Sequence, residues 1–208
     1  MTKIQKNDFI ELNFTGRVKG GDIFDTNILE DARKIDLKLN EIPFIICIGQ
    51  RMVVSGLDNA LEDKEIGKKY IIELTPKQSF GERRAEFVRL IPKKVFLERN
   101  INPKIGMVLA LDNNLSRIVS ISGGRILVDF NNPLSSKTIV YEFIIKRKIE
   151  ELDEKINSLL EYFLKQKTNF KIEDKMTVVE CEQIFKPMIK IINDKFKDVL
   201  NTEFIIKE

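Results

Sequence analysis

The segment from residue 41 to residue 61 limits the possible folds of this chain more than any other. It reads Glu41-Ile-Pro-Phe-Ile-Ile-Cys-Ile-Gly-Gln-Arg-Met-Val-Val-Ser-Gly-Leu-Asp-Asn-Ala-Leu61, a β-branched strand followed by a glycine, two valines and a second glycine. The pattern Ser55-Gly-Leu-Asp58 predicts the capped start of a short helix. The segment therefore predicts a concave, dry site lined by Phe44, Val53, Val54 and Leu57, with no nucleophile among them. Such a site suits chemistry that depends on shape and desolvation.

The composition is that of an ordinary soluble globular protein. The chain has 208 residues, a length that is enough for one large or two small cores. Of these residues 43% are hydrophobic and 32% are charged. The formal net charge of +3 is small and spread along the chain. Its densest basic cluster, Lys146-Arg-Lys148, is expected to be a solvated strand end, because a nucleic-acid surface needs a larger basic stripe.

The chain has no histidine, which excludes histidine-based acid–base catalysis and histidine-ligated metal sites. Cys47 and Cys181 lie far apart in apolar surroundings, so two buried, reduced thiols are predicted, with a disulfide as the alternative. The first residues are polar and lack a secretory apolar core, and no apolar run has the length of a membrane span. We therefore expect a cytoplasmic protein without metal or cofactor.

The pattern of the first part of the chain predicts mostly strands. Alternating or β-branched runs predict strands at 9–14, 23–26, 45–48 and 69–74, with a helix at 56–63. After residue 82 the sequence pattern changes, and short strands are predicted at 107–111, 116–121 and 125–130. A further strand at 138–145 returns to the first part. The simplest interpretation is a small all-β domain (83–130) inserted into a parent domain formed by 1–82 and 131–149.

From residue 150 the hydrophobic period becomes helical. Leu152, Ile156 and Leu159 begin one apolar face, and Pro187 marks the first turn of a second helix. A hairpin lies between these helices and a strand follows them, so residues 150–208 predict a separate α-β-β-α-β domain. The fold class is α+β, and an open sheet edge in this last domain would permit a dimer.

Several segments in the first 145 residues resemble the FKBP-type peptidyl-prolyl isomerases. They are Leu12-Asn-Phe-Thr-Gly16, Ile23-Phe-Asp-Thr26, Pro43-Phe44 with Ile48-Gly49, Val53-Val-Ser-Gly-Leu57, Ser79-Phe-Gly81 and Val140-Tyr-Glu-Phe143. The insertion resembles the insert-in-flap domain of SlyD-type members, and the last domain resembles that of the long archaeal members. This resemblance implies an antiparallel sheet wrapped on a short helix, and isomerisation of X–Pro bonds in unfolded or partly folded proteins.

The resemblance also implies a prolyl pocket. It places Asp25, Phe80 and Tyr141 at the catalytic positions and Phe14, Phe24, Phe44, Val53, Val54 and Leu57 at the substrate-binding positions. Phe14 and Phe80 fall where many members have tyrosine, and the family's hydroxyl at position 80 usually meets the substrate carbonyl. From the residues alone, Asp25 is equally a turn residue, Phe44 and Leu57 are core, Phe80 is a strand-end aromatic, and Tyr141 faces either side.

Such a pocket needs no group that moves a proton. Amide resonance gives the X–Pro bond a rotation barrier of roughly 18–20 kcal/mol, and the twisted transition state is less dipolar than the planar ground state. A dry aromatic recess disfavours the planar form, so it lowers the barrier. Without a hydroxyl at Phe80 the site would lose one hydrogen bond to the substrate, worth about 0.5–1.5 kcal/mol. If that bond forms mainly in the transition state, the rate falls by up to roughly tenfold, so a weaker but active catalyst is expected.

The inserted domain suggests chaperone activity as well. Its candidate apolar surface comprises Leu90, Ile91, Phe96, Met107 and Leu109, although these residues equally suit the core of a small domain. One alternative function is a holdase with little isomerase turnover. Another is an adaptor for nucleic acid or ribosomes through the last domain, where acidic residues largely cancel the lysines. The expected partners are proline-containing unfolded or nascent polypeptides, with no nucleic acid and no membrane.

Overall fold

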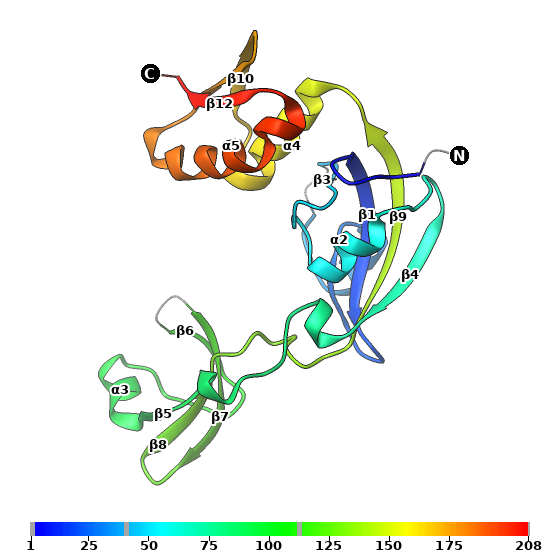
Figure 1. The fold of residues 1–208 in the computed structure, drawn as a ribbon. Coiled ribbons are helices and arrows are strands. Elements are labelled where there is room, and N and C mark those ends of the chain that lie inside the picture. Colours follow the sequence, from blue (N-terminus) through cyan, green and yellow to red (C-terminus); the bar gives the residue numbers. More distant parts are fainter. Residues whose placement is uncertain (1–2, 40–41, 112–113, 208) are drawn as a thin grey trace. The chain divides into compact units, whose positions relative to one another are not determined.

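The computed structural model describes residues 3–39, 42–111 and 114–207, so Glu41, the first residue of the segment 41–61, lies outside the described residues. The chain forms two compact units, one of residues 1–74 with 140–208 and one of residues 75–139 (Figure 1). Each contains an antiparallel sheet and few helices, which confirms the predicted α+β class. No helix within the described ranges has the length and apolar character needed to cross a membrane.

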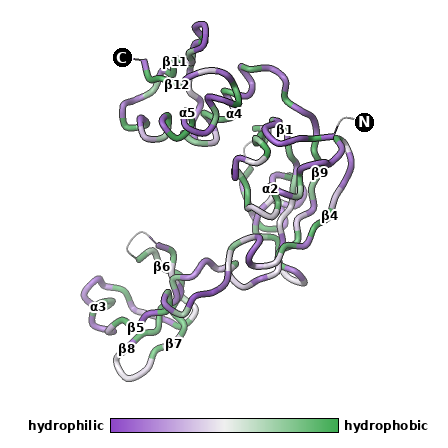
Figure 2. Tube along the Cα trace, viewed as in Figure 1, coloured by the Kyte–Doolittle hydropathy of each residue, from purple (hydrophilic) through white to green (hydrophobic). Residues whose placement is uncertain are grey.

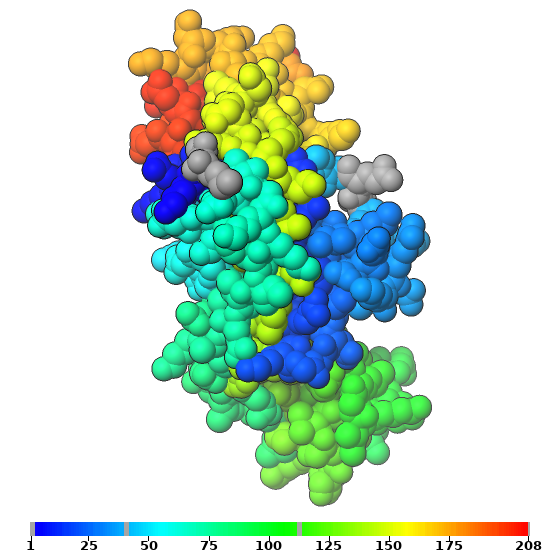
Figure 3. Space-filling view, turned by 90° about the vertical axis from the view of Figure 1, so that its right-hand side faces the viewer, coloured from blue at the N-terminus to red at the C-terminus, as the bar shows by residue number. Residues whose placement is uncertain are grey.

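The main sheet of the first unit has the order β2-β1-β9-β4, with β3 paired to β1. Its strands are β1 (Phe9–Val18), β2 (Ile23–Thr26), β3 (Ile45–Cys47), β4 (Lys69–Leu74) and β9 (Ile139–Ile149). Figure 3 shows β9 as a yellow-green band between the blue atoms of β1 and the teal atoms of β4. The predicted strand at 138–145 is thus longer than expected and lies in the middle of this sheet.

The core of this sheet follows the two-residue period of its strands. Along β9, Tyr141, Phe143 and Ile145 are buried while the residues between them are partly exposed. Figure 2 shows hydrophobic and hydrophilic residues interleaved along the strands in the same way. Phe143 stacks on Tyr70 of β4 with ring centroids 5.5 Å apart, so the aromatic residues of neighbouring strands hold the sheet together.

The short helix α2 (Ser55–Leu61) does not begin as predicted. Val54 occupies the N-cap position, so Ser55 is already the first helical residue. The buried Asp58 carboxylate instead accepts hydrogen bonds from the backbone N–H groups of Gly49 (2.8 Å) and Arg51 (2.9 Å). The pattern Ser55-Gly-Leu-Asp58 was therefore wrongly interpreted as a capping box, and Asp58 anchors the loop that precedes the helix.

The last part of the first unit has the predicted α-β-β-α-β order. Its elements are α4 (Leu152–Leu164), β10 (Asn169–Glu173), β11 (Met176–Glu180), the 3-10 helix η3 (Gln183–Phe185), α5 (Lys186–Leu200) and β12 (Glu203–Ile206). Strand β11 is the central strand of this sheet, antiparallel to β10 and parallel to β12. Ile156, Leu159 and Leu160 form the buried face of α4, as the helical period predicts.

Specific contacts join this part to the main sheet. The rings of Phe196 in α5 and Phe9 in β1 lie 6.2 Å apart. Arg147, from the predicted basic cluster, forms ion pairs with Glu11 and Glu154, and Lys148 contacts Asp8 at 2.7 Å. This basic cluster is thus a set of ion pairs at the end of β9, more specific than the solvated strand end that its composition predicts.

The second unit carries a sheet of order β5-β8-β7-β6, and the prediction that it is all-β was wrong. Its elements are η1 (Pro76–Gln78), η2 (Ala85–Phe87), β5 (Val88–Pro92), α3 (Lys93–Glu98), β6 (Val108–Leu111), β7 (Asn114–Ser122) and β8 (Arg125–Asp129). Helix α3 places Phe96 in the core with Leu111, Ile118, Ile126 and Val128. A sheet of this size needs a second layer over its apolar face, and α3 supplies part of it.

Candidate functional site

Four aromatic side chains from four separate segments meet on one face of the main sheet. Phe14 of β1 lies 5.4 Å from Phe44, which precedes β3, and 6.0 Å from Tyr141 of β9, measured between ring centroids. Phe24 of β2 meets Tyr141 edge-on at 6.0 Å. We call these four residues the aromatic cluster. It forms because β1 lies between β2 and β9 and also pairs with β3, so residues distant in sequence share one face.

Gly16 allows the rings of this cluster to approach β1. A Cβ atom at this position would lie 2.7 Å from Cε1 of Tyr141 and 2.8 Å from Cζ of Phe24. Contacts this short do not occur between carbon atoms in folded proteins, so any side chain here would displace two rings of the cluster. Gly16 belongs to a motif that the sequence singles out, but its role follows only from the sheet geometry.

A polar network behind the cluster fixes β1 against β2. The Asn27 side chain donates to the Leu12 carbonyl and accepts from the Phe14 N–H, both at 2.7 Å. The buried Thr26 hydroxyl donates to the Phe14 carbonyl at 2.9 Å and pairs with the hydroxyl of Thr15. Sequence reasoning missed this network. The run Thr26-Asn27 at the end of a strand was its only local signal, and such residues are ordinary in turns.

Asp25 lies next to the cluster and shapes its electrostatics. Although the residue as a whole is exposed, partial burial raises the pKa of its carboxyl, against the lowering effect of a hydrogen bond from the Thr26 backbone. Burial raises the pKa of the Tyr141 hydroxyl, and the Asp25 carboxylate raises it further. Tyr141 therefore keeps its proton at neutral pH and remains a hydrogen-bond donor beside an acidic group.

The loop 49–54 carries the predicted valines into α2 and is anchored from two sides. Asp58 binds its backbone N–H groups, as described above. From α4, the Tyr162 hydroxyl donates to the Met52 carbonyl at 2.6 Å, and from α5 Lys195 donates to the Gln50 carbonyl at 3.2 Å. Val53 and Val54 are partly exposed, whereas Leu57 is buried. The two valines thus lie on a braced loop, with Leu57 in the core behind it.

Phe80, the remaining predicted catalytic residue, belongs to the second unit. There its carbonyl oxygen accepts a hydrogen bond from the Ser135 hydroxyl at 3.4 Å. The contribution of Phe80 to a prolyl site therefore stays a prediction from the resemblance.

The candidate chaperone surface of the second unit needs correction. Phe96 is only 2% exposed and belongs to the core, while Ile91, Met107 and Leu109 pack against that core and are partly buried. Leu90 alone of the five predicted residues is strongly exposed, at 60%. Successive side chains of a strand alternate between the two faces of the sheet. Residues that face the core were therefore grouped with neighbours that lie on the opposite, exposed face. Val108 and Leu115 are exposed on that outer face with Leu90.

Much of the chain is similar to known FKBP-type proteins. Residues 1–101 match the family model of the FKBP-type peptidyl-prolyl cis-trans isomerase, and residues 89–134 match that of the FKBP26 IF domain. The short-type peptidyl-prolyl cis-trans isomerase of Methanocaldococcus jannaschii is 25% identical over 146 residues, covering 69% of this chain and 91% of that protein. The SlyD isomerase of Aeromonas hydrophila is 27% identical and covers 56% of each chain. A solved structure of the three FKBP domains of wheat FKBP73 aligns with 73% of this chain and 42% of its own, at 12% identity and a TM-score of 0.40.

Proposed function

The chain belongs to the FKBP-type peptidyl-prolyl cis-trans isomerases, as a SlyD-like member, and we propose that its aromatic cluster holds the substrate proline. Four aromatic side chains that converge from four segments around Gly16 carry this proposal. Val53, Val54 and Leu57 complete the substrate side, and Asp25, Tyr141 and Phe80 are the proposed catalytic residues. The proposed parent domain is formed by 1–82 and 131–149, with an inserted domain at 83–130 and a last domain at 150–208.

The proposed mechanism works by differential solvation. The planar prolyl imide carries charge on its oxygen and loses favourable hydration when it enters an aromatic recess. The twisted transition state is less dipolar, so it loses less, and the barrier to rotation falls. The neutral Tyr141 hydroxyl and the Asp25 carboxylate supply polar contacts at the edge of the recess. The substrates are polypeptides that contain proline, and the reaction needs neither a nucleophile nor proton transfer.

The test is catalysed isomerisation of a short X–Pro peptide. We expect measurable acceleration by the wild type and a loss of up to about tenfold in kcat/KM for Asp25→Ala, the value of one polar contact. Asp22→Ala removes an exposed carboxylate four residues after Val18 of β1 and serves as the matched control, with unchanged activity expected. No acceleration by the wild type at high enzyme concentration would contradict the proposed site.

A second activity, binding of unfolded chains, is proposed for the outer face of the β5-β8-β7-β6 sheet. Leu90, Val108 and Leu115 on that face are 60%, 52% and 64% exposed. Leu90 lies on β5, Val108 on the edge strand β6, and Leu115 on β7, so the apolar residues are distributed across the sheet. Exposed apolar residues on a sheet face that is not covered are a common feature of surfaces that bind other chains.

Lysine substitutions on this outer face separate the two activities. We expect the triple variant Leu90→Lys, Val108→Lys, Leu115→Lys to need about tenfold more protein to suppress aggregation of an unfolded client, because burial of three side chains is lost. Its turnover of a short peptide should not change. Ile71→Lys, an equally exposed apolar position on β4, is the control. Equal losses in both assays would count against separate sites.

The alternative of a holdase without turnover is distinguished by stoichiometry. An isomerase accelerates the slow, proline-limited phase of refolding when present in much smaller amounts than its client, whereas a holdase acts in proportion to its concentration. Acceleration at substoichiometric enzyme would support the isomerase. Suppression of aggregation alone would support the holdase.

A further inference from the structure

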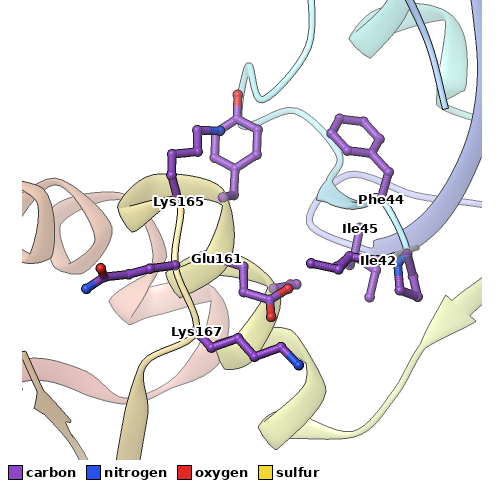
Figure 4. A pocket seen from close by; sticks show the side chains of 10 residues that line it. Ile42, Phe44, Ile45, Glu161, Lys165 and Lys167 are labelled. Carbon is purple, nitrogen blue, oxygen red and sulfur yellow. The ribbon is translucent and has the colours of Figure 1, made fainter. Parts of the chain in front are cut away.

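A hollow of about 330 Å³ lies within the first unit, beside the aromatic cluster. One wall comprises residues 42–45, which lead into β3, and the other comprises residues from α4 and the turn after it. Figure 4 shows Ile42, Phe44 and Ile45 on one side of the hollow and Glu161, Lys165 and Lys167 on the other. The proposed prolyl site does not use this second recess.

The two walls differ in chemistry. The strand side is apolar, and Ile42 is 47% exposed at the mouth of the hollow. The helix side carries two lysines and one glutamate, which gives this wall a net positive charge. The Nζ atom of Lys165 lies 4.5 Å from the ring centroid of Tyr162, so the aromatic ring holds this ammonium group at the hollow. A ligand that suits both walls has an apolar group next to an anionic group.

The hollow adjoins the proposed proline site through a shared residue. Phe44 lines the hollow and is also a member of the aromatic cluster, 5.4 Å from Phe14. The facing wall is fixed to the same region, because the Tyr162 hydroxyl binds the Met52 carbonyl just before Val53. A chain that places its proline against the cluster needs only to pass Phe44 to reach the second recess, since one extended residue spans about 3.3 Å.

We propose that this hollow binds the segment of the substrate polypeptide that flanks the proline, and that it selects an apolar side chain next to an acidic one. The inference rests on the proposed prolyl site and adds the class of substrate that this site prefers. The apolar side chain packs against Ile42 and Phe44, and the carboxylate meets Lys165 and Lys167. Because these lysines are exposed, the preference is modest, about two- to tenfold in kcat/KM, and it weakens at high salt.

The experiment compares three kinds of proline peptide. An uncharged tetrapeptide offers the hollow no acidic or basic side chain and so reports the prolyl site alone, while two longer sets carry either an apolar–acidic or an apolar–basic pair two to four residues from the proline, on either side. The full-length protein is compared with the variant Lys165→Glu, Lys167→Glu. The control variant Lys171→Glu, Lys175→Glu makes the same charge change on β10 and the following turn, at exposed positions that do not line the hollow.

We expect the wild type and the control to prefer the apolar–acidic peptides on one side of the proline. The Lys165→Glu, Lys167→Glu variant should lose or invert that preference, while its turnover of the tetrapeptide stays unchanged. Equal kcat/KM for acidic and basic peptides in the wild type, or an equal shift in both variants, would overturn the inference and leave the prolyl site standing. No turnover of the tetrapeptide by the wild type would instead contradict the proposed function itself.

Discussion

Replacing Gly16 by alanine is expected to lower kcat/KM for a short X–Pro peptide by about 10- to 100-fold, because displacement of catalytic groups by about 1 Å has effects of this size. The added Cβ atom would lie 2.7 Å from the Tyr141 ring and 2.8 Å from the Phe24 ring. Both rings belong to the aromatic cluster, and Tyr141 is buried, so its ring cannot move without disturbing its neighbours. Overpacking of this kind also costs about 1–3 kcal/mol of stability.

The control for this prediction is Gly21→Ala in the turn between β1 and β2. A Cβ atom there would meet Val18 at 3.4 Å, an ordinary contact, so activity and stability should hardly change. Steady-state isomerisation assays and urea denaturation of the wild type and both variants provide the measurements. If Gly16→Ala retains full activity, the proline does not bind at Phe24 and Tyr141, and the proposed location of the site is wrong.

The regular elements of this protein follow closely from local sequence periodicity. Helix α4 begins and ends where its apolar period does, and β2 and β4 have the predicted bounds. Helix α3 escaped prediction because its six residues are too few to show a helical period beside the preceding strand. Phe96 is therefore a candidate for either surface or core from sequence alone, and α3 turns it into the core.

The candidate site depended much more on the family resemblance than on local pattern. Residue chemistry alone left Phe44 and Leu57 as ordinary core residues, and nothing local relates Phe24 to Tyr141 across 117 positions of sequence. Their contact arises because β2 and β9 flank the same strand, β1. For the same reason, the close approach at Gly16 and the anchors of the loop 49–54 became visible only in three dimensions. These features depend on sheet order, which short-range propensities do not encode.

The anchoring of the loop 49–54 leads to the second large effect. Asp58→Ala should lower the free energy of unfolding by about 2–4 kcal/mol, because two backbone N–H groups lose a charged acceptor in partly buried surroundings. The same change releases the loop that carries Val53 and Val54, so kcat/KM for a short peptide should fall by about tenfold through loss of positioning. Urea denaturation and the isomerisation assay measure the two effects on the same samples.

Two further variants separate anchoring from general damage to α2. Asn59→Ala changes the next, exposed residue of the helix and should shift the unfolding free energy by less than about 0.5 kcal/mol. Asp58→Asn keeps a single amide oxygen as acceptor and should fall between Asp58→Ala and the wild type in both measurements. If Asp58→Ala unfolds more easily but retains full activity at urea concentrations below its unfolding transition, the loop is held by Tyr162 and Lys195 alone. The bonds from α4 and α5 to Met52 and Gln50 would then be sufficient to position the valines.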